Sequence, residues 1–223
     1  MENNYVLNLE RAKALLSFVK TNTDEDSVLL NKVKLEFDED HPGFGYSPIE
    51  RIICLSSEPL NGAQDAFIID YMNEEFNLGL KNNTLTRAIH AFLHELGHHI
   101  EMGNMNEDEL ADHLVEYKTY DFDVKMRTRV NMEAIVDITD DMQYYIERVN
   151  DDEIRIDIFF ERMDELTKRY DELRKERIKI DRMYRMNPAE RFADTFAAKI
   201  LDNYLRKSMP ELFEATEHII GKY

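Results

Sequence analysis

The sequence predicts a predominantly helical α+β protein, in which a long helical hairpin is inserted into a small domain with a short antiparallel or mixed sheet. Three observations lead to this fold class. Apolar residues recur at helical spacing over most of the chain, two short N-terminal segments have strand character, and a heptad pattern extends from residue 142 to residue 184. We expect the domain to comprise residues 1–106 and 186–223, and the insertion residues 107–185.

The N-terminal third supplies part of the scaffold of this domain. Apolar spacing predicts a helix over residues 7–20, and alternating or apolar runs predict strands over residues 33–37 and 51–55. Residues 63–76 fit either a helix or a strand, and we expect a helix. Residues 21–26 form a polar break after the first helix. Residues 41–48 contain both Gly and Pro, and we expect a turn or loop there.

The most informative segment is residues 94–98, which read His-Glu-Leu-Gly-His inside a helix predicted from residue 83 to residue 103. Asn83 or Thr84 can cap the start of this helix, and Gly103 is a suitable end. The two histidines fall nearly opposite an apolar face formed by Leu85, Ile89, Phe92, Leu93, Leu96 and Ile100. The apolar face is therefore expected to pack in the core, and the face with the two histidines is expected to bind a ligand.

The spacing of this segment is typical of zinc-dependent hydrolases. His94 and His98 are one helical turn apart, so both imidazoles can reach one metal ion. Glu95 lies at the flank of the same face, where its carboxylate can take a proton from a water molecule at the metal. We therefore expect Zn²⁺ as cofactor and Glu95 as general base. His90 is expected at the surface and His99 partly buried, neither of them a ligand.

A catalytic zinc ion usually has three protein ligands, so a third residue is needed. Glu190 is followed four residues later by Asp194, a spacing that suits a ligand and an acidic residue that orients a zinc-bound imidazole. The small Ala193 and Ala197 would let this helix approach the metal helix closely.

Two alternatives to Glu190 as a ligand remain open at this point. Asn187, Pro188 and Glu190 can form a capping box at a helix start, which would explain that glutamate without a metal. Glu133 and Asp137 repeat the same spacing closer to the histidines, so Glu133 is a competing third ligand.

Together the two segments resemble a known family. Residues 92–100 (FLHELGHHI) and 190–201 (ERFADTFAAKIL) are similar to the paired motifs of ImmA/IrrE-type metallopeptidases of bacteria and phages, HELGH followed by E-x-x-A-(N/D)-x-F-A-A-x-x-L. The resemblance implies a small zincin-like (gluzincin-like) domain with His94, His98 and Glu190 as ligands and Glu95 as base. It also implies a helix-turn-helix transcriptional repressor as substrate. The chain departs from the family in the 91 residues that separate His98 from Glu190, and it lacks the Pro that commonly closes the second motif.

These separating residues are expected to be helical. The heptad pattern from Met142 to Tyr184 would form a helix of roughly 65 Å if unbroken, longer than a domain of this size. It must therefore project, pair with another chain, or fold back near Asn150 and Asp152. We expect an antiparallel hairpin that is either a solvated scaffold or a site for a partner or substrate.

The predicted function is that of a zinc-dependent endopeptidase acting on a protein, with Asp194 fixing one histidine. Tyr120, Tyr184 and His113 are candidates for stabilising the oxyanion. The alternative is a non-catalytic, metal-stabilised acidic module that sequesters a basic DNA-binding protein. Glu95 discriminates between the two, because a purely structural metal site needs no base beside its ligands.

Composition limits the partners and the compartment. The formal net charge of −18 disfavours direct binding to nucleic acid or anionic membranes and favours a basic protein partner. Cys54 is the single cysteine, which excludes an internal disulfide and is typical of a reducing compartment. No signal peptide or membrane span is evident, so a cytoplasmic location is expected. The oligomeric state is not predicted.

Overall fold

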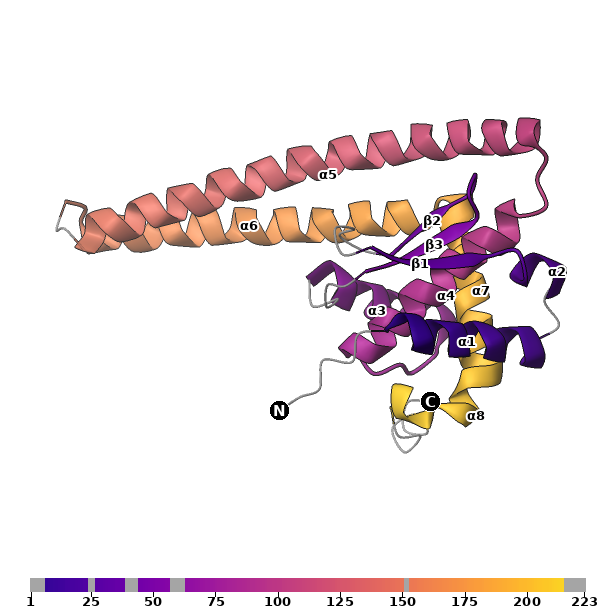
Figure 1. Ribbon diagram of the computed structural model, residues 1–223. Coiled ribbons are helices and arrows are strands. Elements are labelled where there is room, and N and C mark those ends of the chain that lie inside the picture. Colours follow the sequence, from indigo (N-terminus) through magenta and orange to yellow (C-terminus); the bar gives the residue numbers. More distant parts are fainter. Residues whose placement is uncertain (1–6, 24–26, 39–43, 57–62, 151–152, 215–223) are drawn as a thin grey trace. The chain divides into compact units, whose positions relative to one another are not determined.

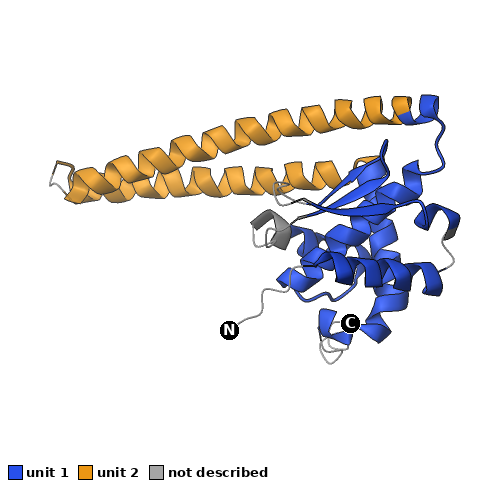
Figure 2. Ribbon diagram, viewed as in Figure 1, with its two compact units in different colours: residues 1–110, 189–223 blue, residues 111–188 orange. Residues whose placement is uncertain are grey.

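The computed structural model describes residues 7–23, 27–38, 44–56, 63–150 and 153–214. Within these ranges the chain is a predominantly helical α+β protein with a small mixed sheet. It divides into two compact units, coloured separately in Figure 2: unit 1 contains residues 1–110 and 189–223, and unit 2 contains residues 111–188. The division falls a few residues from the boundaries expected at 106 and 186.

The sheet of unit 1 has three strands in the order β1-β3-β2: β1 (Lys34–Asp38), β2 (Gly45–Ser47) and β3 (Ile52–Ser56). β1 is parallel to β3, and β2 is antiparallel to β3. The expectation of a loop over residues 41–48 is therefore wrong for β2, because its backbone pairs with β3 despite the flanking Gly and Pro. Residues 41–43 of that predicted loop lie outside the described residues.

The helices predicted over residues 7–20, 63–76 and 83–103 form as α1 (Leu9–Asn22), α3 (Ala63–Phe76) and α4 (Thr84–Met102). α1 begins after Asn8, whose side chain accepts a hydrogen bond of 2.9 Å from the backbone N–H of Arg11. The polar break expected over residues 21–26 is wrong for Thr21 and Asn22, which form the end of α1, and residues 24–26 lie outside the described residues. The other helical elements of this unit are α2 (Ser27–Leu30), α7 (Pro188–Ile200), the π-helical turn η1 (Leu201–Leu205), α8 (Arg206–Ser208) and the 3₁₀ turn η2 (Pro210–Leu212).

The core of unit 1 lies around α4, which packs on β2, β3 and α3. Phe92, Leu93 and Leu96 of α4 are completely buried together with Ile53 and Leu55 of β3. Burial of each such side chain stabilises the fold by roughly 1.5–3 kcal/mol relative to exposure. The apolar face predicted for this helix is therefore the face that anchors it.

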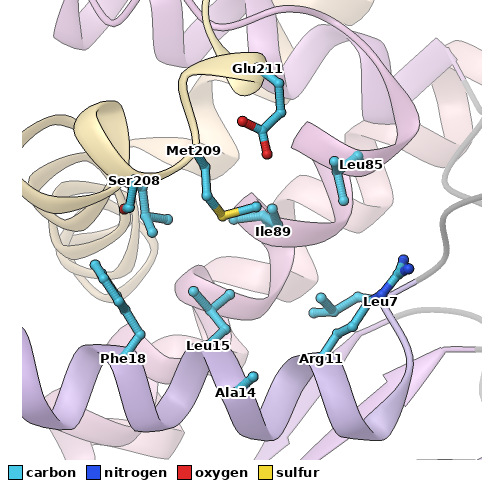
Figure 3. A pocket seen from close by; sticks show the side chains of 11 residues that line it. Leu7, Arg11, Ala14, Leu15, Phe18, Leu85, Ile89, Ser208, Met209 and Glu211 are labelled. Atoms are coloured by element: carbon cyan, nitrogen blue, oxygen red, sulfur yellow. The ribbon is translucent and has the colours of Figure 1, made fainter.

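Unit 1 also contains an apolar cavity of about 430 Å³ between α1, the start of α4 and the segment from Leu205 to Glu211. Figure 3 shows Leu15, Phe18, Ile89 and Met209 pointing into it. Its lining includes a single carboxylate, that of Glu211, and no histidine or cysteine. The cavity therefore lacks the donor set that a protein-bound metal ion needs.

Unit 2 is a helical hairpin made of α5 (Glu107–Asn150), apart from its first turn, and α6 (Ile156–Arg185), and the two helices run antiparallel in Figure 1. Between them, Asn131 donates a side-chain hydrogen bond of 3.1 Å to the carbonyl oxygen of Leu173. Asp152, expected near the bend, lies outside the described residues. Ile156 falls within the segment of the predicted heptad pattern but is 66% exposed, because it is the first residue of α6. No helix in the described part of the chain has the length and apolarity needed to cross a membrane.

Candidate metal centre

Helix α4 places two imidazoles one above the other. The side chain of Asn83 caps its start by accepting a hydrogen bond of 3.0 Å from the backbone N–H of Thr86, and the helix ends at Gly103. His94 and His98 lie one turn apart with ring centroids separated by 4.7 Å and nearly perpendicular planes. Both histidines are buried.

Helix α7 crosses α4 at very short range. A Cβ atom on Gly97 would lie 2.7 Å from the Cα atom of Ala193, so only glycine fits at position 97 without displacing the backbone opposite. The close approach expected from small residues in this segment is thus present at Ala193. It brings Glu190 and Asp194, one turn apart on α7, against the histidines of α4.

The carboxylate of Glu190 lies between the two imidazoles. Its Oε2 is 3.1 Å from Nε2 of His94, and its Oε1 is 3.5 Å from Nε2 of His98. One donor atom from each residue lies within 4.8 Å of the other two, and all three residues are buried. Two imidazole nitrogens and one carboxylate oxygen form a donor set that fits a divalent transition metal such as zinc.

Asp194 holds one of these imidazoles from the side opposite Glu190. Its Oδ1 is 2.8 Å from Nδ1 of His94, and a carboxylate only accepts, so Nδ1 carries the proton and donates. This hydrogen bond leaves Nε2 of His94 directed at Glu190. Fixing the tautomer in this way is the usual task of a carboxylate behind a metal-binding histidine.

The buried carboxylates also set the proton affinity of the histidines. Burial lowers the pKa of His94, but hydrogen bonds and charge from Asp194 and Glu190 outweigh burial and raise it overall. Burial likewise opposes protonation of His98, and hydrogen bonds to Glu101 and Glu190 raise its pKa to about 10. The cluster therefore favours positive charge, supplied by protons or by a metal cation.

Glu95 lies beside this cluster but is not one of the three grouped donors. It is half-buried on α4, and its negative charge contributes to the raised pKa of His98. Glu95 is thus a partly exposed carboxylate close enough to the donors to act on them electrostatically.

The competing ligand and the oxyanion candidates all lie in unit 2. Glu133 is 62% exposed and forms an ion pair of 2.9 Å with Arg129 on the same helix. The hydroxyl of Tyr184 is 2.9 Å from that of Tyr117, and Tyr120 donates to the carbonyl oxygen of Met183. His113 is also on α5. None of these residues belongs to the His/Glu group found among the described residues.

Two histidines of α4 differ from expectation. His90 was expected at the surface but is only 2% exposed, and His99 was expected partly buried but is completely buried. His99 Nε2 donates to the carbonyl oxygen of Leu29 over 2.8 Å, and its Nδ1 is 2.9 Å from the hydroxyl of Tyr46. The sequence carried one sign that His90 and His99 are buried. The apolar face and the ligand face together occupy most of the helix surface, so little of it remains exposed to solvent.

The capping-box explanation of Glu190 is weakened by the geometry. The backbone N–H of Asn187, which such a glutamate would bind, donates to the carbonyl oxygen of Tyr184 at 3.1 Å. The carboxylate of Glu190 is instead directed at the histidines.

Comparisons with known proteins identify no relative of this chain. No protein-family model matches the chain, and neither a curated protein nor a solved structure is significantly similar to it. The geometry described above is thus the basis for assigning a function.

Proposed function

We propose that this protein is a zinc-dependent endopeptidase with a zincin-like domain, similar to the ImmA/IrrE-type metallopeptidases. The observation that carries the proposal is the buried group of His94, His98 and Glu190, with Glu95 beside it. A structural metal site would not need that additional carboxylate. The resemblance of the two motifs to the family agrees with this geometry but rests on some twenty residues.

His94, His98 and Glu190 would hold the metal, and three protein ligands are the number that leaves a position for substrate or water. A bound zinc ion would polarise the scissile carbonyl and lower the pKa of water. Glu95 takes the proton from the attacking water and passes it to the leaving amine. Asp194 keeps His94 in the tautomer that presents Nε2 to the centre.

The sheet offers a way to hold the substrate. β2 is an edge strand of the described sheet and packs against α4, so an extended peptide can pair with its open side. The net charge of −18 favours a basic partner, such as a helix-turn-helix repressor. We place this activity in the cytoplasm, since the single Cys54 requires no oxidising compartment.

The first test is metal content. Protein purified in zinc-containing buffer should hold one zinc per chain, and His94→Ala or Glu190→Ala should lose it or bind it far more weakly. Glu133→Ala is the control and should retain full occupancy. Full occupancy in Glu190→Ala combined with loss in Glu133→Ala would overturn the ligand assignment.

The second test separates the enzyme from a binding module. Purified helix-turn-helix repressors and a library of unstructured peptides are incubated with the protein, with and without chelator. Glu95→Gln should keep the zinc and the fold but abolish cleavage. Partner binding that is unchanged in Glu95→Gln, with no cleavage by the parent protein, would favour the sequestering module.

A further inference from the structure

His90 is a buried histidine that the proposed ligand set does not use. It lies on α4 one turn before His94, is 2% exposed, and its ring centroid is 5.8 Å from that of His94. Its Nε2 lies 3.5 Å from Oδ1 of Asp194. A buried imidazole directed at a buried carboxylate needs an explanation, because burying both polar groups costs free energy unless they interact.

One oxygen of Asp194, Oδ1, lies close to both His94 and His90. Oδ1 accepts the hydrogen bond of 2.8 Å from Nδ1 of His94 and lies 3.5 Å from Nε2 of His90. Asp194 is completely buried on α7, whereas both histidines belong to α4. The carboxylate thus lies between two successive turns of the facing helix, hydrogen-bonded to His94 and close to His90.

We propose that His90 is a positioning residue: it fixes the carboxylate of Asp194, which fixes the ring of His94 and so strengthens metal binding. This inference rests on the metal site of the proposed function. His90 acts through Asp194 and is not a ligand. Residues that orient a metal-binding histidine typically contribute about 10- to 100-fold to metal affinity.

The alternative is that His90 is itself a ligand, because His90, His94 and Asp194 also bring one donor atom each within 4.8 Å of the others. Nδ1 of His94 is the nitrogen that faces Asp194, whereas Nε2 faces Glu190. A metal ion there would have to displace the proton of Nδ1 and break the hydrogen bond of 2.8 Å to Asp194. The geometry therefore favours the positioning role, and stoichiometry distinguishes the two.

The decisive variants are His90→Gln and His90→Asn. Both are neutral amides, but the glutamine amide nitrogen reaches about as far as Nε2 of histidine, whereas the asparagine amide ends about one bond short. We expect zinc affinity, measured by competition with a chromophoric chelator, to fall about tenfold in His90→Asn and to stay within about twofold of the parent in His90→Gln. Metal content should remain one zinc per chain in both.

A double variant tests whether the effect passes through Asp194. Asp194→Ala should weaken zinc binding, and adding His90→Asn should weaken it no further, because the residue through which His90 acts is gone. Additive losses would overturn the inference. His99→Asn is the control: it removes another buried histidine of α4 and should lower the stability of the metal-free protein with little change in zinc affinity.

Failure of this inference is distinguishable from failure of the proposed function. If the parent protein binds no zinc, the metal site and the role of His90 are both wrong. If the parent binds one zinc and His90→Asn binds it equally well, only the role of His90 is wrong. Two zinc ions in the parent and one in both His90 variants would make His90 a ligand. The Co²⁺ absorption spectrum gives an independent readout and should change in His90→Asn but not in His90→Gln.

Discussion

Gly97 and Ala193 lie at a close contact between the two site-bearing helices, since a Cβ atom on Gly97 would stand 2.7 Å from the Cα atom of Ala193. The same Cβ atom would lie 3.0 Å from the carbonyl oxygen of Ala193. Both neighbours are backbone atoms, which cannot move aside as the end of a side chain can. The distance between the histidines and Glu190 therefore depends on the absence of a side chain at position 97.

Gly97→Ala should destabilise the protein by about 1–3 kcal/mol, the usual cost of overpacking a core. The sign is informative, because the same change at an open helical position would stabilise by about 1 kcal/mol. Denaturant unfolding of the metal-free protein measures it. Adding Ala193→Gly should not restore stability, since the nearest atom is Cα. Increased stability in Gly97→Ala would show that the helices are not in contact there.

The stability of the metal-free protein should fall as pH rises from about 6.5 towards 10. The pKa of His98 is raised to about 10, so its contribution is complete below the ordinary pKa of about 6.5 and is lost as pH rises through the folded value. The raised pKa of His94 acts in the same direction. Zinc affinity should rise with pH over this interval, because the metal replaces protons.

Unfolding of the metal-free protein at several pH values, together with proton release on zinc addition, measures both trends. His98→Gln should flatten the decline. Stability of the metal-free protein that increases over this interval would contradict the prediction.

Tyr46→Phe should lower the free energy of unfolding by about 1–3 kcal/mol. Nε2 of His99 donates to Leu29, so Nδ1 is the acceptor and the Tyr46 hydroxyl donates to it. Burial raises the pKa of Tyr46 to about 12 despite the opposing charge of Arg51, which keeps that hydroxyl protonated. Removing it leaves a buried acceptor without this donor. Tyr144→Phe, at a position 47% exposed, is the control and should change stability by less than about 0.5 kcal/mol.

Shortening the hairpin should leave the metal centre intact. Asn131 and Leu173 are hydrogen-bonded across the two helices, so residues 132–172 can be replaced by a short Gly/Asn turn that joins them. Zinc affinity should stay within about twofold, because the donor residues and their partners all belong to unit 1. Helical content should fall with the residues removed. A shortened protein that fails to fold would show that the hairpin is needed as scaffold for unit 1.

The features that follow from local periodicity could be predicted from the sequence. The bounds of α4, its cap at Asn83 and its apolar face depend on residues a few positions apart, and each was found as expected. The grouping of Glu190 with the histidines could also be inferred, because few chemical solutions exist for a third ligand.

The features that depend on contacts between distant segments could not be predicted. His90 is buried because α7 carries Asp194 against that side of α4, and the spacing of the residues around position 90 does not identify this partner. β2 exists because β3 supplies hydrogen-bonding partners, which outweigh the local preference of Gly45 for a turn. In both cases tertiary structure determined what local preference left open.

The contact of Tyr117 with Tyr184 near the base of the hairpin also lowers the entropic cost of bringing the two halves of the metal centre together. His98 and Glu190 are separated by 91 residues, and joining the ends of a flexible loop of that length is entropically costly. A preformed hairpin joined by this contact leaves a loop of about 25 residues to be closed between His98 and Glu190. The saving is on the order of 1 kcal/mol. A long insertion can therefore lie between the two halves of the metal centre with little penalty to its assembly.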